Sequence, residues 1–230
     1  MKQRAYVINL AHRTDRWNNM LQRWPELELI RYNGIMLPKD GRPHDRIASE
    51  GLGLTHMALL YEAHMRGEKT VMIMEDDAVP VPGWYEKWLE QKEYLDTHLD
   101  EWDVCNGGSF DLVECHDVVE LNKSVLIRGS RACAGHFLYL NLNALDEFLN
   151  WPIEKIDIDM FYCNVFTNRF KLYCSYPLMA IQDDGFSDII KDNRDWSLTL
   201  LMNEMTMKHH LGDLYLQYNL PSSAKQSHQS

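Results

Sequence analysis

The sequence lacks the cysteine motifs that bind zinc or build a disulfide framework. Its five cysteines form no CxxC pair, and an odd number without regular spacing predicts reduced thiols in a cytoplasmic protein. The chain also shows no N-terminal signal peptide and no run of about 20 apolar residues, so we expect no membrane span. The expected location is therefore cytoplasmic, either free or peripheral at a membrane.

Positive charge is scarce as well. The 230 residues include 23 Lys and Arg against 34 Asp and Glu, which gives a formal net charge of -11. Such an acidic chain is repelled by a nucleic-acid backbone, so nucleic acid is not an expected partner. A nucleotide is not excluded, because a metal ion and a few local arginines can hold phosphates in an acidic protein.

Apolar strands and amphipathic helices alternate in the first part of the chain. Residues 5–10, 27–32 and 70–74 predict buried strands, and Thr14 is expected to cap the helix between the first two. This alternation predicts an α/β fold with a mostly parallel central sheet and helices on both faces. The predicted apolar stripes are Trp17, Met20, Leu21 and Trp24 on the first helix, and Leu54, Met57, Ala58, Tyr61 and Met65 on the second.

The second half of the chain is less regular and predicts a mixed arrangement. Residues 118–121 and 124–128 indicate an antiparallel hairpin, and 171–176 indicates a last strand. Asn141 is expected to cap a helix, and a short helix is expected over residues 159–168.

The most informative feature is Glu75-Asp76-Asp77, which directly follows the apolar strand 70–74. Three adjacent carboxylates at the end of a buried strand repel one another unless a cation or a donor-rich ligand is present. Ligands of open α/β sheets gather at the carboxyl ends of strands, and a divalent metal holding a diphosphate would neutralise these charges. The alternatives are a solvated acidic turn and, for Glu75 alone, a strand-end residue bonded to the backbone.

Five segments carry a resemblance to a known family, in the same order as in that family. They are residues 7–16, 51–56, 72–78, 134–140 and 182–189. Together they resemble glycosyltransferase family 25, the family of lipooligosaccharide and collagen galactosyltransferases. The chain departs from the family pattern at Thr55, where serine is usual, and at an insertion over residues 183–185.

The resemblance implies an enzyme with a GT-A fold. One domain would cover residues 1–220, with a nucleotide-binding half to about 110, an acceptor half over 111–192 and a helical segment over 193–220; residues 221–230 are expected to be a disordered tail. The implied reaction is inverting, metal-dependent transfer of a hexose, galactose or glucose, from a UDP-sugar. The implied acceptor is a hydroxyl of a glycan or glycoconjugate, and the implied metal is Mn²⁺ or Mg²⁺.

Carboxylates take the central roles in the site that the resemblance implies. Asp77 would ligate the metal, while Asp76 and Glu75 would contact ribose hydroxyls or metal-bound water, with Glu75 a second candidate ligand. An inverting transferase also needs a carboxylate base, for which Asp157 and Asp159 are the candidates. They point to the same side if the segment is extended; Asp159 matches the family spacing better, and its alternative role is a helix N-cap.

Three polar residues lie where the first strand gives way to the first helix. Asn9, Arg13 and Arg16 are candidates for donor binding, because phosphates bind well where arginines meet the N–H groups of a helix start. The alternative is surface ion pairing, for instance of Arg16 with Asp15 or of Arg13 with a carboxylate at the sheet end.

Two further groups of residues are candidates for donor binding. Thr55 and His56 are expected at the start of the second helix, where His56 would bond the nucleotide, orient the acidic residues or be a satisfied structural histidine. Gln182, Ser187 and Asp188 follow the last predicted strand. By resemblance they approach the diphosphate, and the alternative is a surface turn.

Two other functions stay open at this stage. One is a non-catalytic binding module that keeps the shape of a glycosyltransferase, although an intact acidic triplet argues against it. The other is a metal-dependent phosphohydrolase that uses the same carboxylates. The aromatics Trp84, Tyr85 and Trp88 either stack on a sugar or pack in the core.

Overall fold

A computed structural model of the protein describes residues 2–165, 168–187, 189, 192–194 and 197–219. In chain order, the strands are β1 (Arg4–Asn9), β2 (Glu28–Asn33), β3 (Thr70–Glu75), β4 (Ala78–Pro80), β5 (Val104–Asn106), β6 (Phe110–Glu120), β7 (Val125–Cys133), β8 (Phe137–Asn141), β9 (Leu172–Tyr176), β10 (Ala180–Gln182), β11 (Gly185–Ser187) and β12 (Asp192–Arg194). The helices are α1 (Thr14–Arg23), α2 (His44–Met65), α3 (Trp84–Thr97), α4 (Leu145–Leu149), α5 (Ile158–Tyr162), α6 (Ser197–Leu211) and α7 (Asp213–Asn219), with a 3-10 turn, η1 (Leu142–Ala144), before α4.

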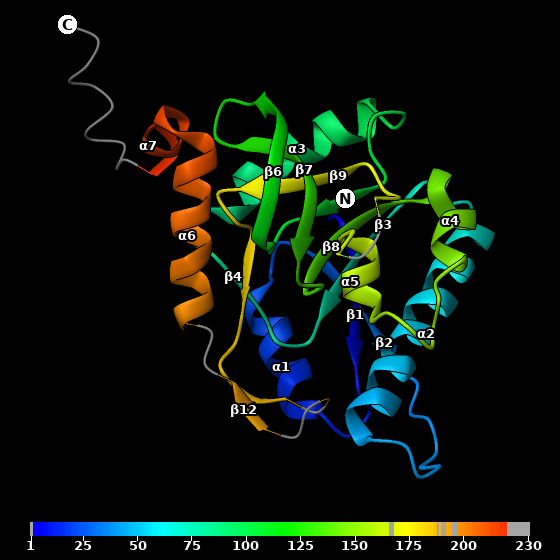
Figure 1. Ribbon diagram of the computed structural model, residues 1–230. Coiled ribbons are helices and arrows are strands. Elements are labelled where there is room, and N and C mark those ends of the chain that lie inside the picture. Colours follow the sequence, from blue (N-terminus) through cyan, green and yellow to red (C-terminus); the bar gives the residue numbers. More distant parts are fainter. Residues whose placement is uncertain (1, 166–167, 188, 190–191, 195–196, 220–230) are drawn as a thin grey trace, which may run out of the picture.

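A single eight-stranded sheet in the order β2-β1-β3-β8-β5-β9-β7-β6 forms the centre of the molecule (Figure 1). β1 runs parallel to β2 and β3, and β5 runs parallel to β9; the other pairings of this sheet are antiparallel. The predicted α/β class is confirmed. The parallel arrangement expected of the sheet holds for β2, β1 and β3, whereas strands from the second half make the whole sheet mixed.

Strands from both predicted halves interleave in this sheet. β8 lies between β3 and β5, so it joins the two parallel groups by antiparallel pairing on each side. The predicted hairpin is confirmed as β6 and β7, which are longer than expected. The division of the domain near residue 110 stays a prediction.

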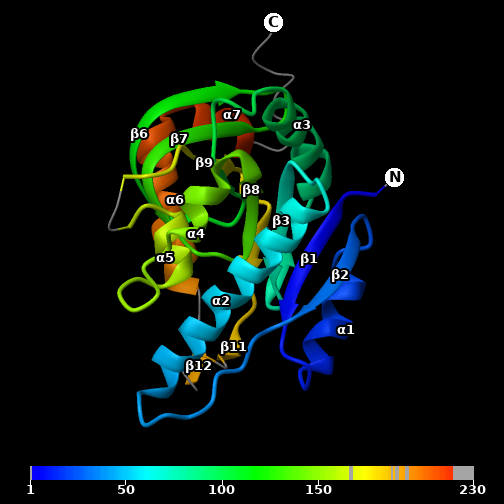
Figure 2. The same cartoon turned by 90° about the vertical axis from the view of Figure 1, so that its right-hand side faces the viewer.

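Helices cover both faces of the sheet (Figure 2), and each face has its own apolar core. Ala5 and Val7 of β1 pack in the core with α1 and α3, while Tyr6 and Ile8 pack in the core with α2, α4 and α5. Burial on both sides explains why β1 and β3 are continuous apolar runs. The aromatic residues Trp84 and Trp88 are buried in the first of these cores, as the packing alternative predicted.

The second helix differs most from its prediction. α2 begins at His44, with Pro43 before it, so it is much longer than expected at its start. Its buried face carries His56, Leu59, Leu60 and Ala63. The predicted stripe was wrong, because Tyr61 and Met65 are 54% and 68% exposed.

Smaller differences concern helix ends. Arg13 is the N-cap residue of α1 and Thr14 is its first helical residue, so the predicted cap was one residue late. Leu21 was expected to be inward but is 49% exposed. Asn141 does cap, since its side chain accepts a hydrogen bond from the N–H of Asn143 at η1. Of the helix predicted over 159–168, the described residues show only the five-residue helix α5 (Ile158–Tyr162).

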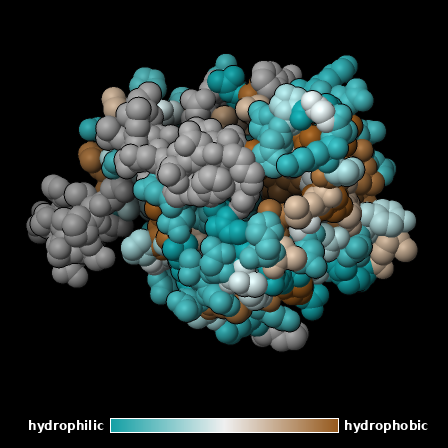
Figure 3. Space-filling view, turned by 90° about the horizontal axis from the view of Figure 1, so that it is seen from below, coloured by the Kyte–Doolittle hydropathy of each residue, from teal (hydrophilic) through white to brown (hydrophobic). Residues whose placement is uncertain are grey.

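The turns after β1 and β3, the start of α2 and the β11–β12 hairpin lie at one end of the sheet (Figures 1 and 2). Seen from that end, the surface is mostly hydrophilic, with hydrophobic residues visible between the hydrophilic ones (Figure 3). Among the described helices, none is both long and apolar enough to cross a membrane. The tail predicted over 221–230 lies outside the described residues.

Candidate functional site

The acidic triplet occupies the end of β3. Glu75 is the last residue of the strand, and Asp76 and Asp77 form the turn that leads into β4. β1 lies beside β3 with Ile8 opposite Glu75, so the end of β1 at Asn9 adjoins the triplet. The carboxyl ends of these parallel strands therefore gather polar residues, as the sequence predicted.

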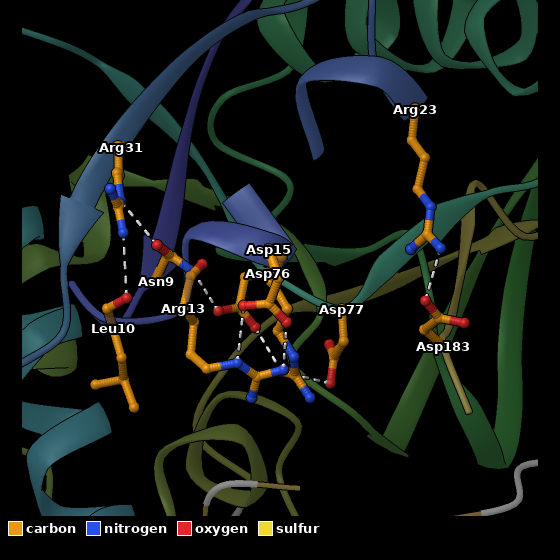
Figure 4. Close-up of polar contacts among 10 residues, drawn as sticks. Asn9, Leu10, Arg13, Asp15, Arg23, Arg31, Asp76, Asp77 and Asp183 are labelled. Atoms are coloured by element: carbon orange, nitrogen blue, oxygen red, sulfur yellow. Dashed lines mark hydrogen bonds and ion pairs between the residues drawn. The ribbon is translucent and has the colours of Figure 1, made fainter. Parts of the chain in front are cut away.

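Asp76 bonds to two protein side chains through its two carboxylate oxygens. Its Oδ2 accepts a hydrogen bond of 2.6 Å from the Asn9 side-chain amide, and its Oδ1 accepts one of 2.6 Å from the Arg16 guanidinium (Figure 4). The expected contact of Asp76 with a ribose hydroxyl stays a prediction, since each of its oxygens accepts one of these bonds. Asp76 instead holds Arg16 at the strand end through a charge-assisted hydrogen bond.

Asp77 is less well paired. Its Oδ1 is buried and has no hydrogen-bond partner among the described residues, and its Oδ2 lies 3.7 Å from Arg16. Burial raises the pKa of Asp77 from 3.8 to about 6; Arg16 opposes this, and the charges of Asp76 and Asp183 add to it. A buried carboxylate oxygen without a donor is suited to a cation.

Glu75 faces the second half of the chain, where Asp159 lies. A Cβ added to Gly135 would come within 3.1 Å of both Glu75 Oε1 and Asp159 Cβ, so the two side chains flank this glycine. Burial raises the pKa of Glu75 well above its usual range, and the charges of Asp77, Asp159 and Asp76 add to the effect. Burial also raises the pKa of Asp159.

The two candidate bases have different surroundings. Asp157 precedes α5 and bonds to α2, through the Ser49 hydroxyl and through Arg46 Nη1 at 3.3 Å. Asp159 lies in the first turn of α5 and accepts from the N–H of Met160 at 2.8 Å. The condition under which both would point to the same side, an extended segment, is not met, because α5 starts between them. The predicted N-cap position belongs to Asp157, which makes no capping bond.

The arginines after β1 form ion pairs, but their partners are exchanged relative to the alternative considered from the sequence. Arg13 pairs with Asp15 through two hydrogen bonds of 3.1 Å, and Arg16 pairs with the sheet-end carboxylate Asp76. Asn9 is buried, and its amide donates to the Arg13 carbonyl at 3.0 Å as well as to Asp76. These contacts bring the three predicted residues together around the turn between β1 and α1.

Thr55 and His56 were expected at a helix start, but both lie inside α2 and are buried. The Thr55 hydroxyl donates to the Gly51 carbonyl at 2.7 Å and accepts from the Ile35 N–H at 2.8 Å, so it fastens the chain before α2 to the helix. His56 packs against the ring of Tyr162, and burial lowers its pKa to about 3. Its Nδ1 has no partner among the described residues. These contacts give Thr55 a structural role, whereas the buried Nδ1 of His56 is not satisfied by any described residue and the role expected of His56 in donor binding stays a prediction.

The chain after β9 returns to the acidic triplet. Gln182 of β10 pairs with Ala78 of β4, and the N–H of Asp183 donates to the Asp77 carbonyl at 2.8 Å. Ser187 lies at the end of β11, and Asp188 lies outside the described residues. The structure thus places Gln182 and Asp183 beside the turn that carries Asp77, and the expected approach of this segment to a diphosphate stays a prediction.

Several residues of the site were not predicted from the sequence. Arg31 donates to the Asn9 side chain at 2.7 Å, Arg23 pairs with Asp183 at 2.7 Å, and Gly135 separates Glu75 from Asp159. The alternation of side chains along β2 places Arg31 on the face of the sheet that α1 covers, so this position could have been predicted from the sequence. Nothing local in the sequence indicated the other two contacts, because each joins residues far apart in the chain.

The metal predicted at Asp77 and Glu75 is an untested expectation. In the part of the chain that the structure describes, no group of three or more His, Cys, Asp and Glu side chains is arranged to hold a metal ion. The unpaired Asp77 Oδ1 and the carboxylates beside it nevertheless fit a hard cation, because Mg²⁺-type sites often take one or two protein carboxylates and complete their shell with substrate phosphates and water.

Comparisons with known proteins found no matching family model and no matching curated protein. Among solved structures, A197 from STIV overlaps 82% of this chain and 87% of its own chain, at 12% identity and a TM-score of 0.48. HddC from Yersinia pseudotuberculosis overlaps 75% of this chain and 68% of its own, at 12% identity and a TM-score of 0.32. HddC complexed with GMP-PN gives 13% identity over 74% of this chain and 70% of its own, with a TM-score of 0.29. Similarity at this level assigns no function.

Proposed function

We propose that the protein is an inverting glycosyltransferase with a GT-A-like arrangement, akin to glycosyltransferase family 25. It transfers a hexose, galactose or glucose, from a UDP-sugar to a hydroxyl of a glycan or glycoconjugate. The observation that carries this proposal is the meeting of Asp159, from the second half of the chain, with the acidic triplet at the end of β3. The proposed donor site and a candidate base then lie at the same end of the sheet.

The donor side is formed by the ends of β1 and β3. Arg16 beside Asp77 offers a fixed positive charge to a diphosphate, and Arg13 stands at the first turn of α1. Asp77, with Glu75 as the second candidate, would hold Mn²⁺ or Mg²⁺. When bound there, such an ion would offset the negative charge of the carboxylates and of the diphosphate leaving group.

The acceptor side is formed by Asp159. It takes the proton of the acceptor hydroxyl as that oxygen bonds to the anomeric carbon, while the bond from that carbon to the diphosphate breaks on the opposite side. A pKa raised by burial suits a base that works near neutral pH. Asp157 is the weaker candidate, because its Oδ1 already bonds to both Ser49 and Arg46.

Transfer assays with a panel of UDP-hexoses, sugar acceptors and Mn²⁺ test the proposal. Asp159→Asn should lower kcat by about 10²–10⁴-fold while the binding of UDP with Mn²⁺ persists. Asp157→Asn is the matched control and should retain most of the activity. Release of phosphate from simple esters without an acceptor would instead favour a phosphohydrolase. Binding of UDP without transfer from any donor would favour a non-catalytic module.

A further inference from the structure

Arg31 connects the edge strand β2 to the candidate donor site. It stands opposite Val7 in the pairing of β1 and β2, on the face of the sheet that α1 covers. Its guanidinium lies 5.8 Å from the centre of the Trp17 ring of α1. This placement directs the guanidinium toward the turn between β1 and α1.

The guanidinium makes three hydrogen bonds to that turn, and Figure 4 shows those to Asn9 and Leu10. Nε donates to Asn9 Oδ1 at 2.7 Å, and Nη2 donates to the carbonyls of Leu10 at 3.2 Å and Ala11 at 3.0 Å. These bonds use the planar fork of arginine, which lysine cannot reproduce with its single ammonium group. Arg31 therefore fixes three consecutive residues at the end of β1.

The bond to Asn9 also sets the orientation of the Asn9 amide. With Oδ1 accepting from Arg31, Nδ2 faces the other way and donates to the Arg13 carbonyl and to Asp76 Oδ2. Asp76 in turn holds Arg16 at 2.6 Å, and Arg16 lies 3.7 Å from Asp77. A continuous series of hydrogen bonds and ion pairs thus runs from β2 to the acidic triplet.

We propose that Arg31 is a positioning residue for the nucleoside diphosphate part of the donor. It keeps the β1–α1 turn, Arg13 and Arg16 in the arrangement that receives the diphosphate, and it does so without contacting the nucleotide. The inference rests on the proposed function and adds to it a residue that acts on donor binding and not on acceptor binding. Residues that orient ligand-contacting groups commonly change affinity by about 10–100-fold when they are replaced.

Titrations of the full chain with UDP in the presence of Mn²⁺ test the role of Arg31. Arg31→Lys keeps the charge but loses the fork, and Arg31→Ala loses both. We expect each variant to weaken UDP binding by about 10–100-fold, and in transfer assays to raise the donor KM while the acceptor KM stays unchanged.

Arg66 provides a matched control, because it bonds to Glu68 at 2.8 Å and Tyr6 at 2.9 Å and lies over the Tyr6 ring, in the connection before β3. Arg66→Lys should bind UDP as the wild type does. Wild-type affinity in Arg31→Lys, or an equal loss in Arg31→Lys and Arg66→Lys, would overturn the positioning role. A wild-type protein that binds no UDP with Mn²⁺ would overturn the proposed function itself, together with this inference.

Discussion

Replacement of Asp77 by asparagine should make the protein more stable at neutral pH. Burial of the Asp77 carboxyl group raises its pKa more than the charge of Arg16 lowers it, so the pKa rises from 3.8 to about 6. In the folded state this acid keeps its proton to higher pH than in the unfolded state. The stability that protonation supplies is therefore complete below pH 3.8 and is lost as the pH rises through about 6. Asparagine carries no such charge at any pH.

The size of this effect follows from the two pKa values. A rise from 3.8 to about 6 corresponds to about 3 kcal/mol at pH 7, and to about 1 kcal/mol at pH 4.5. For a chain of 230 residues, 3 kcal/mol would raise Tm by about 6–12 °C at most. Urea unfolding of the wild type and Asp77→Asn between pH 4.5 and 8 measures the difference directly.

Asp76→Asn is the control for that experiment, since it changes the neighbouring residue in the same way. Asp76 accepts short bonds from Asn9 and Arg16, so its replacement should destabilise the protein by about 1.5–3 kcal/mol. The two substitutions should thus act in opposite directions. An Asp77→Asn protein less stable than the wild type at pH 7, or a difference that does not change with pH, would refute the reasoning.

Three other predictions concern residues around the site. Thr55→Val should lower the free energy of unfolding by about 1–3 kcal/mol in urea titrations, because the N–H of Ile35 loses its acceptor and the carbonyl of Gly51 loses a donor; Thr55→Ser keeps the hydroxyl and should change little. Gly135→Ala should lower kcat at least about tenfold, with the circular dichroism spectrum unchanged, since its Cβ would enter the space between the two carboxylates. His56 should take up a proton only on unfolding as the pH falls from 6.5 toward 3, because burial lowers its folded pKa to about 3. The loss of stability between pH 6.5 and 5 should therefore be smaller in His56→Gln, as urea titrations would measure.

Periodicity predicted the strands well and one helix face badly. The apolar runs of β1 and β3 are long enough to be read directly, and their alternation between two cores follows from the geometry of a strand. On α2, the predicted stripe and the observed set of His56, Leu59, Leu60 and Ala63 both have helical spacing. Spacing alone cannot choose between two apolar faces of one helix, and tertiary contacts decide.

Two glycines also made the start of α2 hard to predict from the sequence. Gly51 and Gly53 look like helix breakers, yet both are buried inside the helix. A Cβ on Gly51 would come within 2.4 Å of the Ile35 carbonyl, and one on Gly53 within 1.9 Å of the Trp151 ring. Here glycine allows close approach of other segments, which is a property of the packed fold and not of the local sequence.

Part of the candidate site could be predicted from the sequence. Charge repulsion after an apolar strand identified the acidic triplet. The position of Asn9 and Arg16 between the first strand and the first helix made them candidates for donor binding. The contacts that give each carboxylate its own environment involve Arg31, Gly135 and Asp183, which come from distant parts of the chain. Their positions depend on how the second half folds against the first, and no local pattern encodes that.

Thermal unfolding of the wild type with Mn²⁺, with UDP, and with both tests the central claim most directly, which is that the end of β3 binds a metal and a diphosphate together. A ligand that binds only the folded state raises Tm by mass action. We predict a rise that requires both ligands and is absent in Asp77→Asn. A rise of equal size in Asp77→Asn, or no rise in the wild type with UDP and Mn²⁺ together, would contradict the claim.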